Sequence, residues 1–191
     1  VPQLKMLSSN LRRDVWQRAF LIRFRITPVT LQNTEFKMAR KILIWAIFYA
    51  ATIVAASSAV LWEIQSYYFA LEQPFYAPPA WLFGPVWTIL YIFIATLGYR
   101  IVMAPQSDIK PILIALWTLQ FALNTIWTPS FFGAQNLGVA LIYIAALDVT
   151  VLITMVLLWS RDRISFWLAA PYMVWIGFAT ALNAGFLILN G

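Results

Sequence analysis

The fold is decided by long apolar runs, of which residues 137–159 are the clearest example: Leu137-GVALIYIAALDVTVLITMVLL-Trp159. Asp148 is the only charged residue in this run. At 1.5 Å of rise per residue, an α-helix of this length crosses the hydrocarbon layer of a bilayer, which is about 30 Å thick. A helix is expected because every backbone polar group must find a partner within the segment. The run therefore predicts a transmembrane helix.

Four other runs have the same character. The five predicted spans are Ile42–Trp62, Ala80–Met103, Ile112–Phe132, Leu137–Trp159 and Ile164–Leu189. The whole chain is 62% hydrophobic and 10% charged, whereas soluble domains average about half apolar and a quarter charged. We expect an all-α membrane protein, a five-transmembrane-helix bundle formed by residues 38–191, with the lipid bilayer as its surroundings.

The distribution of charge predicts an orientation. With five spans, all 13 Lys and Arg residues fall on one side of the membrane. The 63–79 loop on the other side contains only Glu63 and Glu72 as charged residues. The positive-inside rule then places the N-terminus in the cytoplasm and the C-terminus outside. The net charge of +6 is thus an orientation signal, and we expect no nucleic-acid partner.

Residues 1–37 form a basic extension that differs from the rest. Three interpretations stand side by side: an organelle-targeting or membrane-surface segment, a cytoplasmic amphipathic tail, or sequence upstream of a natural start at Met38. The host membrane follows from this choice. We expect a bacterial cytoplasmic membrane, or an organelle membrane if the extension is a targeting segment.

The chain has no Cys and no His. Disulfides, structural zinc, thiol nucleophiles, imidazole bases and the usual haem ligands are therefore excluded. We expect no metal site and no required cofactor. Binding or chemistry must rely on carboxylates, hydroxyls, amides, Met sulfur and aromatic rings.

Amide side chains indicate which helix faces point inward, because an amide facing lipid is costly. Gln120, Asn124 and Asn183 lie within predicted spans. Helical spacing places each amide on a face with aromatic rings. Two faces carry the amides: Trp117-Gln120-Asn124-Trp127 and Tyr172-Trp175-Ala179-Asn183. A third face, Phe83-Trp87-Tyr91, carries aromatic rings alone. Together they predict a cavity walled by rings, suited to a flat, largely apolar ligand with a polar edge.

Each of these features has a structural alternative. Aromatic residues in membrane proteins often form belts at the interface, and Asn or Gln often only join helices. Asp148 is either a functional intramembrane carboxylate or a protonated, internally paired one. The aromatic 63–79 loop is either a lid over the bundle or an interfacial anchor.

Three stretches resemble signatures of the TspO/MBR family (translocator protein, tryptophan-rich sensory protein). They are LEQPFYAPPAWLFGPVWTILY at 71–91, QFALNTIWTPSFFG at 120–133 and PYMVWIGFATALN at 171–183. The resemblance runs from about Ile42 to Asn190. It implies a five-helix bundle, often a homodimer, that binds porphyrins.

The resemblance also implies site residues. The ligand-binding set is Phe83, Trp87, Tyr91, Gln120, Asn124, Trp127, Trp175 and Ala179, with Tyr67 and Tyr68 from the lid. Trp87 and Trp175 match the two tryptophans that the family associates with light-dependent porphyrin breakdown, so they would be catalytic if degradation occurs. We expect a tetrapyrrole-binding sensor or transporter-like protein. The alternatives are a porphyrin-degrading enzyme and a regulatory scaffold without turnover.

Overall fold

The structure, a computed structural model, describes residues 28–58, 62 and 64–191. Ile44–Gly191 form one compact unit, and the residues before Ile44 belong to another. All regular elements are helical among the residues described. They are α2 (Pro28–Ser58), α3 (Ile64–Ala70), η2 (Ala80–Leu82), α4 (Phe83–Met103), α5 (Lys110–Thr128), η3 (Pro129–Gly133), α6 (Leu137–Leu158) and α7 (Arg163–Asn190).

Within the described part of the chain, five helical stretches are long and apolar enough to cross a membrane, as the sequence predicted. They are Glu35–Ser57, Ala80–Met103, Lys110–Gly133, Leu137–Leu158 and Arg163–Asn190. Helix α2 begins at Pro28, upstream of the predicted first span, so the expected boundary after residue 37 falls inside a helix. The interpretations of the basic extension concern mostly residues 1–27, which lie outside the described part of the chain.

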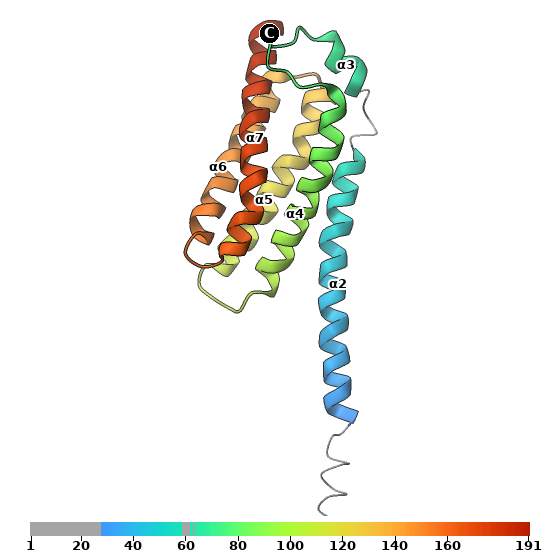
Figure 1. The fold of residues 1–191 in the computed structure, drawn as a ribbon, viewed down its shortest axis with the longest axis vertical. Helices are drawn as coiled ribbons and strands as arrows, with labels where there is room; N and C mark the ends of the chain where they lie inside the picture. Colours follow the sequence, from blue (N-terminus) through green and yellow to red (C-terminus); the bar gives the residue numbers. More distant parts are fainter. Residues whose placement is uncertain (1–27, 59–61, 63) are drawn as a thin grey trace, which may run out of the picture. The chain divides into compact units, whose positions relative to one another are not determined.

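Helices α4, α5, α6 and α7 run side by side (Figure 1), and α6 packs against both α5 and α7. Their shared core is built from aliphatic side chains, such as Ile94, Ile144 and Ile176, that are almost completely buried. Large apolar residues on the outward faces remain exposed, as Val174 and Ile188 are. This distribution is expected where lipid, and not water, covers the protein.

The unit that starts at Ile44 includes the second half of α2, which touches α4 and α5 through a few specific contacts. The ring of Phe48 packs edge-on against Trp117 at 4.6 Å between ring centroids. The hydroxyls of Tyr49 and Thr96 lie 2.8 Å apart. Gly98 of α4 makes room for these rings, because a Cβ atom there would lie 2.5–2.6 Å from Phe48 and Trp117.

At one end of the bundle, an ion pair joins the end of α4 to the start of α7. Arg100 Nη2 lies 2.8 and 2.9 Å from the two carboxylate oxygens of Asp162, and Arg100 Nε donates to Ser165 Oγ at 2.9 Å. Asp162 also caps α7 by accepting a hydrogen bond from the backbone N–H of Ser165 at 3.2 Å. Burial raises the pKa of Asp162, but the hydrogen bonds from Ser165 and the charge of Arg100 outweigh it and lower the pKa below its usual value.

Gly98→Ala tests the packing of α2 against α4 and α5. We expect it to lower the free energy of unfolding by about 1–3 kcal/mol, because the added methyl group overlaps two rings that are already packed. Gly177→Ala is the matched control, since nothing lies within 4 Å of a Cβ atom there. It should leave stability unchanged or raise it by up to about 1 kcal/mol. Thermal unfolding in detergent measures both, and equal midpoints for the two variants would contradict the packing.

Asp162→Asn tests the ion pair and has a defined pH dependence. The folded-state pKa of Asp162 is lowered, so the ionised carboxylate stabilises the fold fully above the unfolded value of about 3.9. This contribution is lost as pH falls through the lower folded pKa. We expect the variant to be about 1–2 kcal/mol less stable at neutral pH. The gap should close in strong acid.

Unfolding midpoints measured from neutral pH into acid give this comparison. Asp108→Asn is the control, because Asp108 is exposed and forms no ion pair with any other described residue. A stability gap for Asp162→Asn that does not depend on pH would show that the carboxylate charge is not what stabilises the bundle end.

Candidate functional site

A cavity of about 440 Å³ lies at the end of the bundle where α2, α5 and α7 finish and α4 begins. This volume is in the range of pockets that hold small organic ligands. Its wall is mainly aromatic and aliphatic, and its rings come from five elements. They are Tyr68 of α3, Phe83, Trp87 and Tyr91 of α4, Trp127, Phe131 and Phe132 of α5 and η3, and Phe186 of α7.

The α4 wall follows directly from sequence spacing. Steps of four residues place Phe83, Trp87 and Tyr91 on one face of the helix, and all three side chains line the cavity. The rings of Trp87 and Tyr91 lie 5.5 Å apart, and Phe83 meets Tyr68 of α3 at 5.6 Å. The prediction that these three residues share a chamber is consistent with this arrangement.

Asn183 lines the cavity and joins α7 to α5 and α6 by hydrogen bonds. Its amide nitrogen donates to the backbone oxygen of Leu137 on α6 at 2.9 Å. Its amide oxygen accepts from Trp127 Nε1 on α5 at 3.2 Å. Asn183 is only 1% exposed, and both ends of the amide are used. The side chain therefore fixes the edge of the Trp127 ring, which lines the cavity.

Asn124 lies beside the cavity but does not line it. Its oxygen accepts from the Tyr91 hydroxyl at 3.1 Å, and its nitrogen donates to the Tyr172 hydroxyl at 3.2 Å. The amide thus bridges α4 and α7 from α5. Asn124 orients Tyr91, and Tyr91 in turn presents its ring to the cavity.

Gln120 is the third predicted amide. It is buried as expected, but it lies outside the cavity wall. Neither its oxygen nor its nitrogen has a hydrogen-bond partner among the described residues. Trp117, from the same stripe, turns toward α2 and α4, where its Nε1 donates to the Ile94 oxygen at 2.9 Å. This half of the stripe belongs to helix packing, contrary to the expectation that the whole stripe lines a cavity.

Trp175 and Tyr67 also lie outside the wall. The Trp175 ring packs behind Phe83 with 5.8 Å between centroids, and its buried Nε1 has no partner among the described residues. Tyr67 packs against Phe131 at 6.0 Å. Of the predicted set, Tyr68, Phe83, Trp87, Tyr91, Trp127 and Ala179 line the cavity, while Tyr67, Gln120, Asn124 and Trp175 do not.

The loop before α4 closes one side of the cavity. Ile64, Gln65 and Tyr68 of α3 contribute to the wall. The Tyr68 hydroxyl donates to the Pro78 oxygen at 2.8 Å. Burial raises the pKa of this hydroxyl, so it keeps its proton. The loop is thereby folded back on itself above α4.

Two contacts fasten this loop to α7. Glu72 and Asn190 exchange two hydrogen bonds, from Glu72 N to Asn190 Oδ1 at 2.8 Å and from Asn190 Nδ2 to Glu72 O at 3.0 Å. The Tyr76 hydroxyl donates to the Ala181 oxygen at 2.9 Å and lies over Gly185, where a Cβ atom would collide with it. Of the two interpretations of the 63–79 loop, a lid over the bundle or an interfacial anchor, these contacts agree with the lid.

Several lining residues were missed by the sequence analysis. Phe131 lies seven residues beyond Asn124, and Phe186 lies seven beyond Ala179. Both therefore continue stripes already identified, and extending each stripe by one turn beyond Trp127 or Asn183 finds them. Ala55 and Gly84 carry no such signal, because small residues reveal a cavity only when their neighbours are known.

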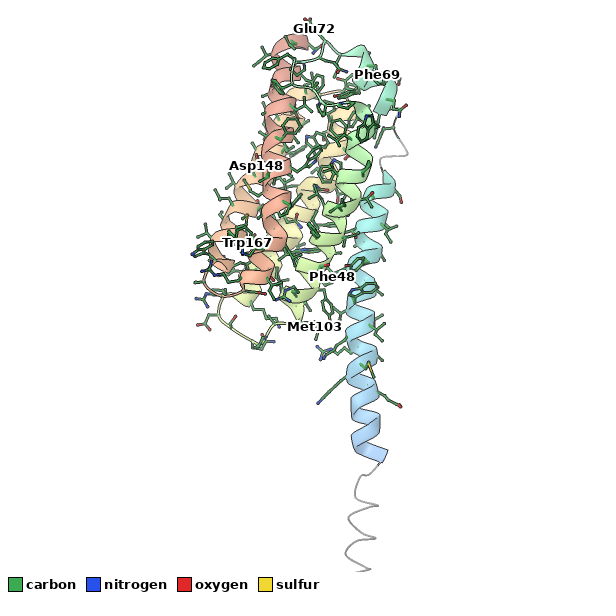
Figure 2. The ribbon with its side chains drawn as sticks, in the orientation of Figure 1. Phe48, Phe69, Glu72, Met103, Asp148 and Trp167 are labelled. Atoms are coloured by element: carbon green, nitrogen blue, oxygen red, sulfur yellow. The ribbon has the colours of Figure 1, made fainter. Side chains whose placement is uncertain are left out.

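Asp148 lies midway along α6, between the bundle end marked by Glu72 and the end marked by Trp167 (Figure 2). Thr180 Oγ1 of α7 donates to Asp148 Oδ2 at 2.7 Å. The other carboxylate oxygen is buried without a partner among the described residues. Asp148 does not line the cavity, and its hydrogen bond agrees with the internally paired interpretation.

The fold and the cavity define a polytopic helical membrane protein with an aromatic internal pocket. The family model "TspO/MBR family" matches residues 42–189, so the chain belongs to the TspO/MBR family. It is 37% identical over 158 residues to the tryptophan-rich protein TspO of Archaeoglobus fulgidus, covering 81% of this chain and 97% of that protein.

Two other relatives show how widely the likeness extends. Protein CrtK of Rhodobacter capsulatus is 32% identical over 148 residues, covering 77% of this chain and 92% of CrtK. The translocator protein of Homo sapiens is 32% identical over 124 residues, covering 61% of this chain and 70% of that protein.

Asn183→Leu tests the junction behind the cavity. The change keeps the approximate volume but leaves Trp127 Nε1 and the Leu137 oxygen without partners. We expect a loss of about 1–3 kcal/mol in unfolding free energy. Thr118→Val is the control, because the exposed Thr118 hydroxyl bonds only to Ile114 of its own helix. Denaturant titration in mixed micelles measures both, and a loss no larger than the control's would disprove the structural role of Asn183.

Proposed function

We propose that this protein binds a tetrapyrrole, of the porphyrin or haem type, in its aromatic cavity and acts as a membrane sensor or transporter-like protein. The observation that carries the proposal is a chamber whose walls are aromatic rings from α3, α4, α5 and α7. Flat aromatic macrocycles gain stabilisation from rings stacked against their faces and edges. A chamber inside the membrane also favours a largely apolar ligand.

Polar groups on the wall suit the polar edge of such a ligand. Gln65 and Thr128 line the cavity, and neither side chain is hydrogen-bonded to another described residue. Both can therefore receive a carboxylate or an N–H group from the ligand. The Tyr91 and Tyr68 hydroxyls, in contrast, already donate within the protein.

In the proposed complex, stacking against aromatic rings holds the porphyrin, and no metal–protein bond is needed. The chain has neither His nor Cys, which are common protein ligands of haem iron. The described residues contain no group of three or more His, Cys, Asp or Glu side chains suited to a metal ion. A metal-free porphyrin is thus an adequate ligand for the proposed site.

Among the relatives, one is called a tryptophan-rich sensory protein, in Cereibacter sphaeroides, and another a translocator protein, in Homo sapiens. These names support sensing or transport over turnover. Degradation by two tryptophans would need both indoles at the ligand. Trp87 lines the cavity, whereas Trp175 does not, although its ring packs against Phe83 of the wall. Binding is therefore the function that the geometry supports best.

We place the N-terminus in the cytoplasm and the C-terminus outside, on the strength of the one-sided distribution of Lys and Arg. Relatives in Rhodobacter and Archaeoglobus favour a prokaryotic cytoplasmic membrane. The homodimer implied by the family resemblance stays a prediction.

Protoporphyrin IX titration tests the site. Gly84 lines the cavity, and nothing lies within 4 Å of a Cβ atom there. Gly84→Leu therefore has room for its Cβ atom and adds bulk at the cavity, and we expect it to weaken binding at least about tenfold. Trp87→Ala should weaken binding about three- to tenfold through lost ring contacts. The change in porphyrin absorbance on addition of protein is the measurement.

Gly177→Leu is the matched control. It introduces the same side chain into equally open space, but Gly177 does not line the cavity. Its affinity should equal that of the wild type. Tight binding by Gly84→Leu, or equal weakening by the two leucine variants, would show that the porphyrin binds elsewhere.

A further inference from the structure

The two ends of the bundle differ in charge. At the end where α4 finishes and α7 begins, the connections carry Arg161, Asp162 and Arg163, together with Asp108 and Lys110. At the other end, Glu72 is the only charged side chain in the described connecting residues 62, 64–79 and 134–136. The basic end therefore faces a different layer of headgroups from the cavity end.

Two arginines at the basic end, Arg161 and Arg163, have positive charges that no nearby carboxylate among the described residues neutralises. The carboxylate of Asp162 is taken by Arg100, at 2.8 Å. Within the described part of the chain, neither Arg161 nor Arg163 forms an ion pair with a carboxylate. Both side chains are exposed. The α6–α7 turn thus presents two free guanidinium groups within three residues.

Arg163 is held in place by an aromatic row. Its guanidinium carbon lies 4.2 Å from the centroid of the Trp159 ring. Trp159 packs edge-on against Phe166 at 4.8 Å, and Phe166 packs against Trp167 at 5.2 Å. One face of the guanidinium is covered by the indole, so its N–H edges are the part left to bind an anion.

A shallow, open groove of about 310 Å³ lies on the first two turns of α7, beginning at Arg163. Its wall is formed by Arg163, Ile164, Trp167 and Leu168. Ile164 and Trp167 are 61% and 63% exposed, and Trp is typical of the membrane–water boundary. The groove therefore joins a cationic end to an apolar floor at the depth where a lipid headgroup meets its acyl chain.

We propose that this groove binds one anionic phospholipid, with its phosphate on Arg163 and Arg161 and an acyl chain along Ile164, Trp167 and Leu168. The apolar floor favours a lipid over a free phosphate ion. The two uncompensated charges favour a lipid with net negative charge over a zwitterionic one, whose own cation would face them. The site is remote from the aromatic cavity and does not rest on porphyrin binding.

Native mass spectrometry of the purified full-length protein in micelles tests the proposal. Phosphatidylglycerol and phosphatidylcholine are titrated separately, and the bound fraction is recorded. We expect phosphatidylglycerol to bind more tightly, and Arg161→Gln/Arg163→Gln to weaken its binding about fivefold per arginine. Trp167→Ala should weaken binding of the same lipid without any change of charge.

Arg40→Gln/Lys41→Gln is the matched control, because it removes the same charge from two exposed residues of α2. It should change phosphatidylglycerol binding less than twofold. Equal losses in both double variants would reduce the effect to net charge and overturn the site. The site would also be overturned if the wild type showed no preference for phosphatidylglycerol. The same holds if inorganic phosphate displaced the lipid equally well from the wild type and from Trp167→Ala.

Discussion

The structure depends on satisfying polar side chains where no water is available. Asn183 uses both ends of its amide, on Trp127 of α5 and on the backbone of α6. Asn124 does the same between Tyr91 of α4 and Tyr172 of α7. Leaving either amide unpaired at this depth would be costly. The hydrogen bonds of Asn124 and Asn183 therefore hold α4, α5, α6 and α7 in their observed arrangement. The aromatic rings on the same faces are carried inward as a result.

The cavity is lined by large rings and small residues together. Trp87, Trp127 and Phe131 share its wall with Ala55 and Ala179, whose side chains are too short to fill the space between the helices. Tyr68 and the loop fastened to α7 close one side. The interhelical amides thus support the walls, while the apolar rings supply the surface on which a ligand would rest.

The bundle is organised differently at its two ends. The cavity end is covered by a loop that is poor in charge and rich in aromatic residues, with Phe75 fully outside at 99% exposure. The opposite end is tied by the Arg100–Asp162 ion pair and leaves two arginines beside an apolar groove. A ligand inside the bundle and a lipid at its edge can therefore be studied independently in one protein.

The five spans follow from the amino-acid sequence alone, because each apolar run of sufficient length has one stable form in a bilayer. It also determined that Gln120, Asn124 and Asn183 are buried, since amides avoid lipid. Helical spacing alone grouped Phe83, Trp87 and Tyr91 on one face.

Which inward-facing residues border empty space depends on how the helices pack against one another. Trp117 and Trp127 share a stripe, yet Trp117 packs against Phe48 of α2 and Trp127 lines the cavity. Trp175 packs against Phe83 of the wall but does not line the cavity itself. Periodicity specifies the direction in which a side chain points, but a neighbouring helix determines whether it meets another side chain or a void. That depends on helix register and on small residues such as Gly84 and Gly98, which no single-helix pattern encodes.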